Sequence, residues 1–319
     1  MENRHHILVL AELEPADRER LMRAAPEAVF HFGASSQALQ TADIIIGQAD
    51  PKQLCEAKNL KWLQLSWAGA EPYVAPGILP EGVILTNVTG AFGLAISEHM
   101  VASALMLMKK LHLYRDNMSH AVWMDRGNVR SVDQSVVLTV GLGDIGGNFA
   151  RRMKALGAYT IGIRRTEAPK PDYIDEIYLS DRLDEVLPRA DIIGLALPGT
   201  QLTRGLFNAE RLARLKQDAI LINVGRGNAI DCMALAEALE KNRIGGCALD
   251  VTDPEPLPPE HPLWKCENAL ITPHISGFYH VHRTYENIVD IFEENLRRYL
   301  RGMQLIHVVD PGTGYCRKD

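Results

Sequence analysis

Short apolar runs alternate with stretches of helical periodicity along almost the whole chain. The apolar runs predict strands at 7–10, 43–46, 62–65 and 83–86, and then at 136–140, 160–163, 192–197, 219–224, 247–251 and 270–271. Helical patterns lie between many of them, at 18–24, 145–156, 209–215 and 232–241. This alternation is typical of parallel sheets with helices on both faces, so the pattern predicts an α/β fold.

A long helical pattern at 94–113 and a polar stretch at 114–134 separate the two series of strands. The chain has 319 residues, which is long for a single hydrophobic core. We therefore expect two domains, with a connection between them in the polar stretch. One more helical pattern, at 285–300, follows the second series.

Composition and charge narrow the function classes. Hydrophobic residues make up 46% and charged residues 23%, which excludes a disordered, collagen-like or coiled-coil protein. With 40 acidic and 34 basic side chains the net charge is -6, so no basic excess is present to neutralise nucleic-acid phosphates. No apolar run is long enough to cross a bilayer, and we find no export signal. The expectation is a protein without a nucleic-acid or membrane partner.

Two residue types bear on location and metals. The five cysteines form no CxxC pair, which predicts reduced thiols in a cytoplasmic protein. The histidine pairs at 5–6 and at 280 and 282 lack the partner ligands of a zinc site, so we expect no metal.

A glycine-rich turn opens the second series of strands. Gly141, Gly143 and Gly146 fit G-x-G-x-x-G between an apolar strand and a helix that begins near Asp144 and Ile145. The first glycine permits a tight turn, the second lets the backbone approach a pyrophosphate, and the third lets helix and strand pack closely. Amides at the helix N-terminus then face the phosphates. The turn predicts dinucleotide binding, and its alternative is a purely structural turn.

The end of the next strand bears on which dinucleotide is bound. NAD-specific folds place an acidic side chain about 20 residues beyond the glycines, for the ribose 2′-hydroxyl. Here the strand at 160–163 ends in Arg164, Arg165 and Thr166. Guanidinium groups bind phosphate oxygens at two points, so this end favours the 2′-phosphate of NADP(H), with NAD(H) possible.

Three polar side chains follow the ends of later predicted strands, namely Arg226, Glu255 and His274. Ligands of doubly wound sheets bind at the carboxyl ends of the strands, so these side chains are expected to converge on one crevice. Taken singly, each has a structural alternative: a surface cation, a loop carboxylate and a buried hydrogen-bonded histidine.

Four ordered motifs resemble the D-isomer-specific 2-hydroxyacid dehydrogenase family, which includes glyoxylate/hydroxypyruvate reductases, D-lactate dehydrogenases and phosphoglycerate dehydrogenases. The motifs are GLGDIG at 141–146, NVGRGNAID at 223–231, LDVTDPEPLP at 249–258 and TPHISG at 272–277. The resemblance extends to LSWAGA at 65–70, NVTG at 87–90, ISEH at 96–99 and ALPGT at 196–200.

The resemblance implies a role for each matching residue. His274 is the general acid that protonates the substrate carbonyl oxygen, Glu255 orients its ring, and Arg226 binds the substrate carboxylate. Histidine titrates near neutrality, and arginine recognises a carboxylate at two points, so the residue types suit reduction of a 2-oxo acid. Asp250 is the implied partner of the nicotinamide carboxamide, and the backbone of Ala68, Gly69 and Ala70 binds the substrate carboxylate. The remaining implied cofactor contacts are Pro198, Thr203, Val224, Ser276 and Gly277.

The resemblance also implies an architecture. It predicts a flavodoxin-like substrate domain at 1–98 and 278–319, a Rossmann dinucleotide-binding domain at 99–277, and a cleft between them. The region at 100–108 is the implied interface of a homodimer. Thr139 departs from the usual pattern, at a strand position that is commonly apolar or glycine, and we expect it to reduce packing without affecting function.

The implied function is an NAD(P)-dependent D-2-hydroxyacid dehydrogenase that reduces a small 2-oxo acid such as glyoxylate or hydroxypyruvate. The alternative of another class is a non-catalytic dinucleotide-sensing protein of the corepressor type, because such relatives keep the same three side chains. A formate dehydrogenase is disfavoured, because that branch carries Gln where this chain has Glu255. The glycine turn at 141 lies too far along the chain for an L-lactate or L-malate dehydrogenase.

Overall fold

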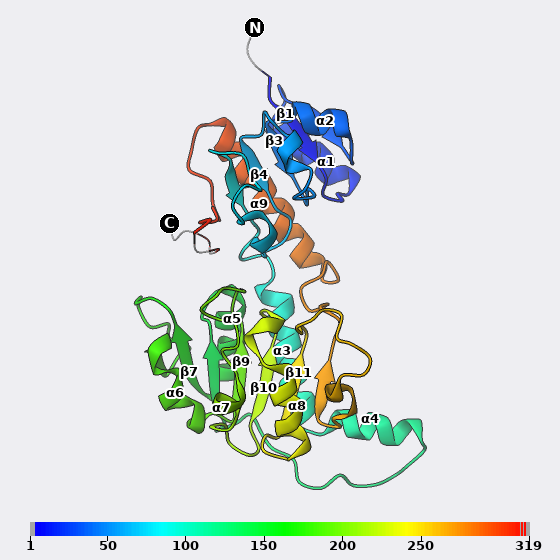
Figure 1. The fold of residues 1–319 in the computed structure, drawn as a ribbon, viewed down its shortest axis with the longest axis vertical. Helices are drawn as coiled ribbons and strands as arrows, with labels where there is room; N and C mark the ends of the chain where they lie inside the picture. Colours follow the sequence, from blue (N-terminus) through cyan, green and yellow to red (C-terminus); the bar gives the residue numbers. More distant parts are fainter. Residues whose placement is uncertain (1–3, 313, 315, 317–319) are drawn as a thin grey trace. The chain divides into compact units, whose positions relative to one another are not determined.

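The computed structural model describes residues 4–312, 314 and 316, and divides into two compact units (Figure 1). Unit 1 consists of residues 1–91 and 281–319, and unit 2 of residues 92–280. Each is an α/β unit built on one parallel sheet, so the predicted fold class is confirmed. Among the described residues, no helix combines the length and the apolar character needed to span a membrane.

Unit 1 contains a five-stranded sheet in the order β2-β1-β3-β4-β5, the flavodoxin-like order. Its strands are β1 His6–Val9, β2 Val29–Phe32, β3 Ile44–Ile46, β4 Trp62–Gln64 and β5 Ile84–Thr86. Its helices are α1 Pro15–Ala24, α2 Ser36–Thr41 and α9 His282–Leu300, and α9 packs against α1. The C-terminal helix therefore completes the N-terminal unit.

Unit 2 contains a seven-stranded sheet in the order β12-β11-β10-β9-β6-β7-β8. Its strands are β6 Val136–Val140, β7 Tyr159–Arg164, β8 Glu176–Leu179, β9 Ile192–Leu195, β10 Ile220–Asn223, β11 Gly246–Leu249 and β12 Ala269–Ile271. Its helices are α3 Gly93–Met108, α4 Leu111–Ser119, α5 Asp144–Ala155, α6 Leu183–Val186, α7 Ala209–Leu212 and α8 Cys232–Glu240.

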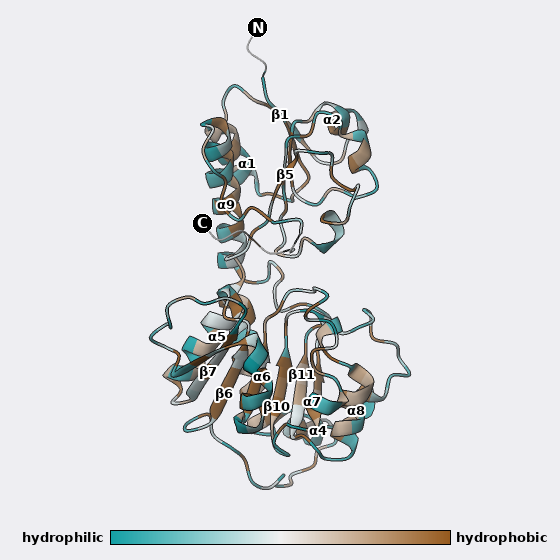
Figure 2. Cartoon of the chain, turned by 60° about the vertical axis from the view of Figure 1, so that its left-hand side comes forward, coloured by the Kyte–Doolittle hydropathy of each residue, from teal (hydrophilic) through white to brown (hydrophobic). Residues whose placement is uncertain are grey.

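The core of unit 2 lies between its sheet and the covering helices. Strands β9, β10 and β11 are buried along their whole length, because helices cover both faces of a parallel sheet. Figure 2 shows strands such as β6 and β10 in the hydrophobic colour, beside helices with mixed faces. In α5 the buried residues Gly146, Phe149, Ala150 and Met153 recur at helical spacing, so one stripe of the helix faces the sheet.

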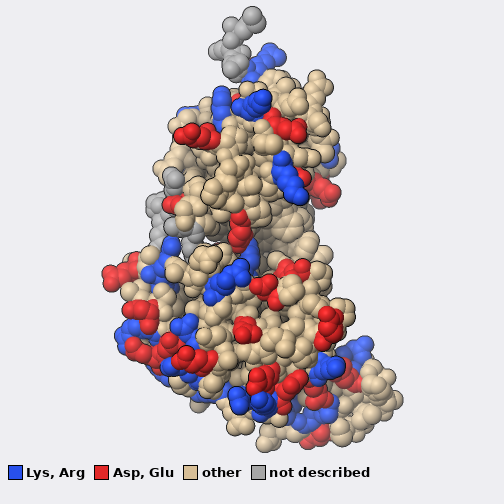
Figure 3. Space-filling view, in the orientation of Figure 1, with Lys and Arg blue, Asp and Glu red and all other residues tan. Residues whose placement is uncertain are grey.

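Two strands of the structure, β2 and β8, are not among those that the sequence pattern predicts. β2 and β8 are the edge strands of their sheets, and most of their residues are only partly buried. A strand that is buried on neither face lacks the continuous apolar run by which the inner strands were found. The surface shown in Figure 3 carries basic and acidic side chains interspersed, so this face presents both signs of charge together.

The chain passes between the units at 91/92 and at 280/281. The prediction of a connection at 114–134 is therefore wrong, because this stretch belongs entirely to unit 2 and its first part forms α4. The expected boundaries at 98/99 and 277/278 differ from the observed ones by a few residues. The reason is that α3, which begins at Gly93, packs as a whole against α5, β10 and β11 of unit 2.

Candidate active site

The glycine turn after β6 has the geometry that its sequence predicts. Gly141 has a φ of 97°, and a Cβ built on it would lie 2.6 Å from the carbonyl oxygen of Ala196. A Cβ on Gly146 would lie 1.9 Å from the carbonyl oxygen of Gly141. A Cβ on Gly143 would meet nothing within 4 Å, so the backbone there borders open space. Two glycines thus permit close packing, and the third leaves a cradle that a phosphate fits.

Helix α5 begins directly after this cradle. Gly143 is its N-cap, Asp144 and Ile145 form its first turn, and the N–H groups of such a turn suit an anion. The Asp144 carboxylate accepts a hydrogen bond from Asn148 at 3.0 Å. The same carboxylate lies against Gly93 at the start of α3, since a Cβ on Gly93 would be 2.2 Å from its Oδ1. This negative charge is therefore directed toward α3.

The end of β7 lies beside the glycine turn, because β6 and β7 are parallel neighbours. Arg164 is partly buried and donates to the carbonyl oxygen of Pro169 at 3.2 Å, while Arg165 and Thr166 are exposed. A depression of about 310 Å³ adjoins this end, lined by Arg164, Glu167, Ala168, Ile177, Tyr178 and Leu179. The guanidinium groups of Arg164 and Arg165 and the carboxylate of Glu167 thus lie at the strand end that is expected to select between NADP(H) and NAD(H).

The loop after β9 forms the next part of this sheet edge. Thr203 donates its hydroxyl to the carbonyl oxygen of Pro198 at 2.7 Å and accepts from the N–H of Thr200 at 2.9 Å. A Cβ on Gly199 would lie 3.2 Å from Cγ of Arg226. The loop that carries Pro198 and Thr203 therefore packs on the stem of Arg226.

Arg226 follows the end of β10. Val224 and Gly225 separate it from the strand, and the side chain of Asn223 ties this turn together. The amide of Asn223 donates to the carbonyl oxygen of Arg226 at 3.0 Å and accepts from the N–H of Gly225 at 3.1 Å. The guanidinium group of Arg226 also donates to the carbonyl oxygen of Gly225 at 2.8 Å. Asn223 thus orients the turn, a role that only its position in the motif could have indicated.

The loops after β10 and β11 touch each other. A Cβ on Gly227 would lie 1.9 Å from the carbonyl oxygen of Thr252, so only glycine fits there. The N–H of Thr252 donates to Oε1 of Glu255 at 3.0 Å. The loop that carries Arg226 therefore packs directly on the loop that carries Glu255.

Glu255 and His274 form the centre of the arrangement. Nδ1 of His274 lies 3.0 Å from Oε2 of Glu255, and both side chains are nearly half exposed. Among the residues that the structure describes, the other ring nitrogen of His274, Nε2, has no hydrogen-bond partner. His274 also has a φ of 52°, in the left-handed region that non-glycine residues rarely adopt. Glu255 can thus set the ring orientation and the tautomer.

Asp250 holds the loop that carries His274. Its carboxylate accepts from Thr272 Oγ1 at 2.6 Å, Ile275 N at 2.9 Å, Ser276 N at 3.0 Å and Ser276 Oγ at 2.5 Å. Burial alone would raise the pKa of Asp250, but these hydrogen bonds hold that pKa below its ordinary value. The four donors match the roughly four lone-pair sites of a carboxylate, so Asp250 orients the loop. Ser276 is occupied in this way, and Gly277 lies against Ile96 of α3.

In unit 1, the loop at 65–70 follows the carboxyl end of β4. Its carbonyl oxygens are occupied: Trp67 O accepts from Val88 N at 3.4 Å, Ala68 O from Asn87 Nδ2 at 2.6 Å and Ala70 O from Tyr73 N at 2.9 Å. Within the described part of the chain, the N–H groups of Ala68, Gly69 and Ala70 have no acceptor. We call these three successive open amides, those of residues 68–70, the nest, since each can donate to an anion.

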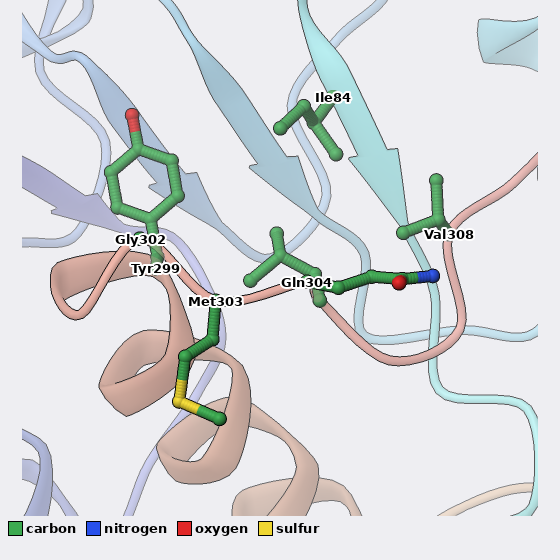
Figure 4. Close-up of a pocket in the computed structure, with 7 residues that line it drawn as sticks. Ile84, Tyr299, Gly302, Met303, Gln304 and Val308 are labelled. Carbon is green, nitrogen blue, oxygen red and sulfur yellow. The ribbon is translucent and has the colours of Figure 1, made fainter. Parts of the chain in front are cut away.

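Unit 1 also has a hollow of about 410 Å³, shown in Figure 4 and lined by Ile84, Tyr299, Gly302, Met303, Gln304, Leu305 and Val308. Ile84 is the first residue of β5, so the hollow lies at the amino end of this strand. Ligands of such sheets bind at the carboxyl ends, where the loop at 65–70 lies. The hollow is therefore not part of the candidate active site.

Comparison with known proteins identifies related sequences and a matching family model. The family model described as D-isomer specific 2-hydroxyacid dehydrogenase, NAD binding domain, matches residues 101–276. A glyoxylate reductase of Thermofilum pendens is 30% identical over 246 residues, which are 73% of this chain and 70% of that protein. A formate dehydrogenase of Arabidopsis thaliana is 30% identical over 71% of this chain and 60% of its own length.

Solved structures are similar over almost the whole chain. A D-isomer specific 2-hydroxyacid dehydrogenase family protein from Aeromonas salmonicida is 32% identical, with a TM-score of 0.85 over 97% of this chain and 100% of that one. An NADPH-dependent glyoxylate/hydroxypyruvate reductase from Sinorhizobium meliloti, in complex with NADP and sulfate, is 27% identical, with a TM-score of 0.84. That match covers 98% of this chain and 100% of the reductase.

Proposed function

The chain belongs to the D-isomer specific 2-hydroxyacid dehydrogenase family of NAD(P)-dependent oxidoreductases, and from this premise we propose that it reduces glyoxylate, hydroxypyruvate or a similarly small 2-oxo acid. The observation that supports the proposal best is the His274–Glu255 pair, with Nδ1 held at 3.0 Å and Nε2 open. The pair follows β11 and β12, at the same edge of the sheet as Arg226 and the glycine turn.

The residues of unit 2 fit a nicotinamide dinucleotide. The open cradle at Gly143 and the first turn of α5 would hold the pyrophosphate, and the bound cofactor would supply a hydride to the substrate carbonyl carbon. In this proposal Nε2 of His274 donates the proton that the carbonyl oxygen needs. Glu255 sets the orientation and the tautomer of the ring through its contact with Nδ1.

The substrate carboxylate requires its own partners. We assign one to Arg226, whose planar guanidinium group offers two parallel donors that lysine lacks. We assign the other to the open amides of Ala68, Gly69 and Ala70, since each can donate to an anion. We propose that Asp250 binds the nicotinamide carboxamide. To do so, its carboxylate must give up one of its four present hydrogen bonds.

We propose NADP(H) as the preferred cofactor, with NAD(H) as the alternative. Arg164, Arg165 and Thr166 at the end of β7 suit a 2′-phosphate, and the Sinorhizobium meliloti relative is described as NADPH-dependent. Arg164→Asp should shift the kcat/KM ratio from NADPH toward NADH. Arg243→Asp is the matched control, because this exposed arginine precedes β11 at the opposite edge of the sheet. An unchanged ratio in the Arg164 variant would refute the assignment.

We further propose a homodimer. Helix α3, the expected interface, has Met100, Leu107 and Met108 buried within its own unit. Large apolar side chains are instead exposed on the stretch that follows it: Met118, Val122, Trp123, Met124 and Val129. A second copy would cover this surface. Light scattering should give twice the chain mass for the wild type, and Trp123→Glu should shift it toward the monomer.

A cytoplasmic location is the last part of this proposal. None of the five cysteines forms a disulfide, which supports a reducing compartment. Fractionation of the source cells would test it.

The decisive experiment follows absorbance at 340 nm with a panel of 2-oxo acids and either NADPH or NADH. Turnover of glyoxylate or hydroxypyruvate supports the reductase, and His274→Ala should then reduce kcat at least about a hundredfold with cofactor binding retained. Tight cofactor binding without turnover of any acid would refute the proposal and favour a dinucleotide sensor.

A further inference from the structure

The nest at 68–70 has no regular structure of its own, so other parts of unit 1 must hold it in shape. A short hydrogen bond to it comes from a side chain: Asn87 Nδ2 donates to the carbonyl oxygen of Ala68 at 2.6 Å. This bond turns the carbonyl of Ala68 toward Asn87. Because the peptide unit is planar, the direction of a carbonyl also determines the direction of the following N–H, which is that of Gly69. The Asn87 amide therefore orients a donor of the nest.

Asn87 is itself held at each of its polar groups. It is 3% exposed. Its Oδ1 accepts from Thr89 N at 3.1 Å and from the thiol of Cys316 at 3.1 Å. Its N–H donates to the carbonyl oxygen of His307 at 3.2 Å, and its own carbonyl accepts from Gln64 at 3.2 Å. The two donors on Oδ1 identify it as the oxygen, so Nδ2 is left for Ala68.

A second layer of buried amides joins Asn87 to the C-terminal part of the chain. Asn295 of α9 donates to Gln64 Oε1 at 2.8 Å, and both side chains are fully buried. Asn295 also accepts from the N–H of Ile306 at 2.8 Å, which fixes the segment that leads to His307. Buried amides without alternative partners keep a single arrangement, because any rearrangement would leave a buried polar group unpaired.

From these contacts we propose that Asn87 is a positioning residue for anion binding, and that the C-terminal segment holds it through Cys316, His307 and Asn295. The proposal rests on the proposed function, in which the nest binds the substrate carboxylate. It assigns a role to residues near the end of the chain, which no motif contains. The thiol of Cys316 lies 3.1 Å from Asn87 Oδ1 and 3.3 Å from Thr89 Oγ1, and its one proton is donated to one of these oxygens at a time.

The first test variant is Asn87→Asp, which keeps the shape of the side chain. It replaces the donor to Ala68 by an oxygen, so the carbonyl of Ala68 is repelled and the nest turns. Losing one charge-assisted hydrogen bond to the substrate carboxylate corresponds to about a tenfold change in affinity or more. We expect KM for glyoxylate to rise at least about tenfold, with kcat changed much less, because ground state and transition state lose the same bond. The Kd for NADPH should stay within about twofold, since the glycine turn belongs to unit 2.

A second readout does not depend on turnover. Hydrogen exchange followed by mass spectrometry should show faster exchange in the peptide that covers 65–74 for Asn87→Asp, with unchanged exchange in the peptide that covers 141–150. This arm decides the positioning role even if the wild type reduces no 2-oxo acid. In that case the proposed function fails, while hydrogen exchange at 65–74 still shows whether Asn87 positions the nest.

Cys316 provides the second pair of variants, in case Asn87→Asp does not fold. Cys316→Ala removes a donor to Asn87 and should speed exchange at 65–74 and raise KM by about threefold, whereas Cys316→Ser keeps a donor and should behave like the wild type. Cys55→Ala is the control, because this exposed cysteine of unit 1 donates to the carbonyl oxygen of Lys52 and, among the described residues, to no part of the nest or of Asn87. Folded variants of Asn87 and Cys316 with wild-type exchange at 65–74 and wild-type KM would overturn the proposal.

Discussion

Thr139 offers a test of how this protein tolerates a polar atom in its core. It lies in the middle of β6, pairs with Gly162 of β7 and Gly194 of β9, and is 0% exposed. Among the described residues, nothing accepts from or donates to its hydroxyl. A valine at this position would have the same shape, with a methyl group in place of the hydroxyl. Thr139→Val should therefore stabilise unit 2.

The magnitude follows from the hydroxyl alone. A buried polar group without a partner costs about 1–3 kcal/mol. The added methyl group is slightly larger than the hydroxyl, so in this fully buried position part of the gain is lost to crowding. We expect a net stabilisation of about 1 kcal/mol, which for a unit of this size raises the melting temperature by about 2–4 °C.

Thr160 of β7 is the matched control, because it is equally buried but bonded. Its hydroxyl donates to the carbonyl oxygen of Tyr173 at 2.8 Å and lies 3.1 Å from Asp175 Oδ2. Thr160→Val should destabilise unit 2 by about 1–3 kcal/mol, since it leaves these acceptors without their donor. Calorimetry and urea denaturation of both variants would measure the difference. If Thr139→Val is less stable than the wild type, the hydroxyl has a partner and the reasoning is wrong.

Three further predictions concern the site and its surroundings. Arg226→Lys keeps the charge but loses two-point binding, so kcat/KM for the 2-oxo acid should fall at least about tenfold, and wild-type kinetics would refute the carboxylate assignment. Gly143→Ala should bind NADPH at least about tenfold more weakly in a fluorescence titration without losing stability, because its Cβ meets nothing within 4 Å in the protein itself. Gly141→Ala should lose both NADPH affinity and stability, since its Cβ would lie 2.6 Å from a carbonyl oxygen. Hydrogen bonds from Arg189, Tyr178 and Tyr159 lower the pKa of Glu176 to about 2. Because this folded-state pKa lies below the unfolded value of about 4.3, the stabilisation is complete above that value and is lost as pH falls toward 2. Acid denaturation of Glu176→Gln should therefore be less steep in that window, and an equal slope would contradict the assignment.

The positioning of the proposed catalytic groups depends on residues that carry no chemistry themselves. The side chain of Asn223 donates to the carbonyl oxygen of Arg226, and the backbone N–H of Thr252 donates to Glu255. The Asp250 carboxylate accepts from the Thr272 hydroxyl before His274 and from the N–H of Ile275 after it. Substituting Asn223 or Asp250 should therefore alter the proposed catalysis, whereas a substitution at Thr252 leaves its backbone N–H in place.

Local and periodic features could be predicted from the sequence. The inner strands are buried on both faces, so continuous apolar runs identify them. The glycine turn could be placed because its glycines are needed for local reasons, namely a tight turn and close approach of the backbone. The positions of Arg226, Glu255 and His274 followed from strand ends, since parallel strands bring their carboxyl ends to one edge. Edge strands β2 and β8 were missed because a half-exposed strand has no such run.

Only the tertiary structure decided which segments belong together. The polar stretch at 114–134 resembles a linker in composition, but ion pairs of Arg126 with Glu267 and of Arg130 with Asp218 attach it to unit 2. The four donors on Asp250 and the contacts of Asn87 with Ala68, His307 and Cys316 join residues far apart in the chain. Composition and periodicity indicate whether a residue favours a buried or an exposed position in a helix or strand. A hydrogen bond between distant segments depends instead on where the whole chain places those segments.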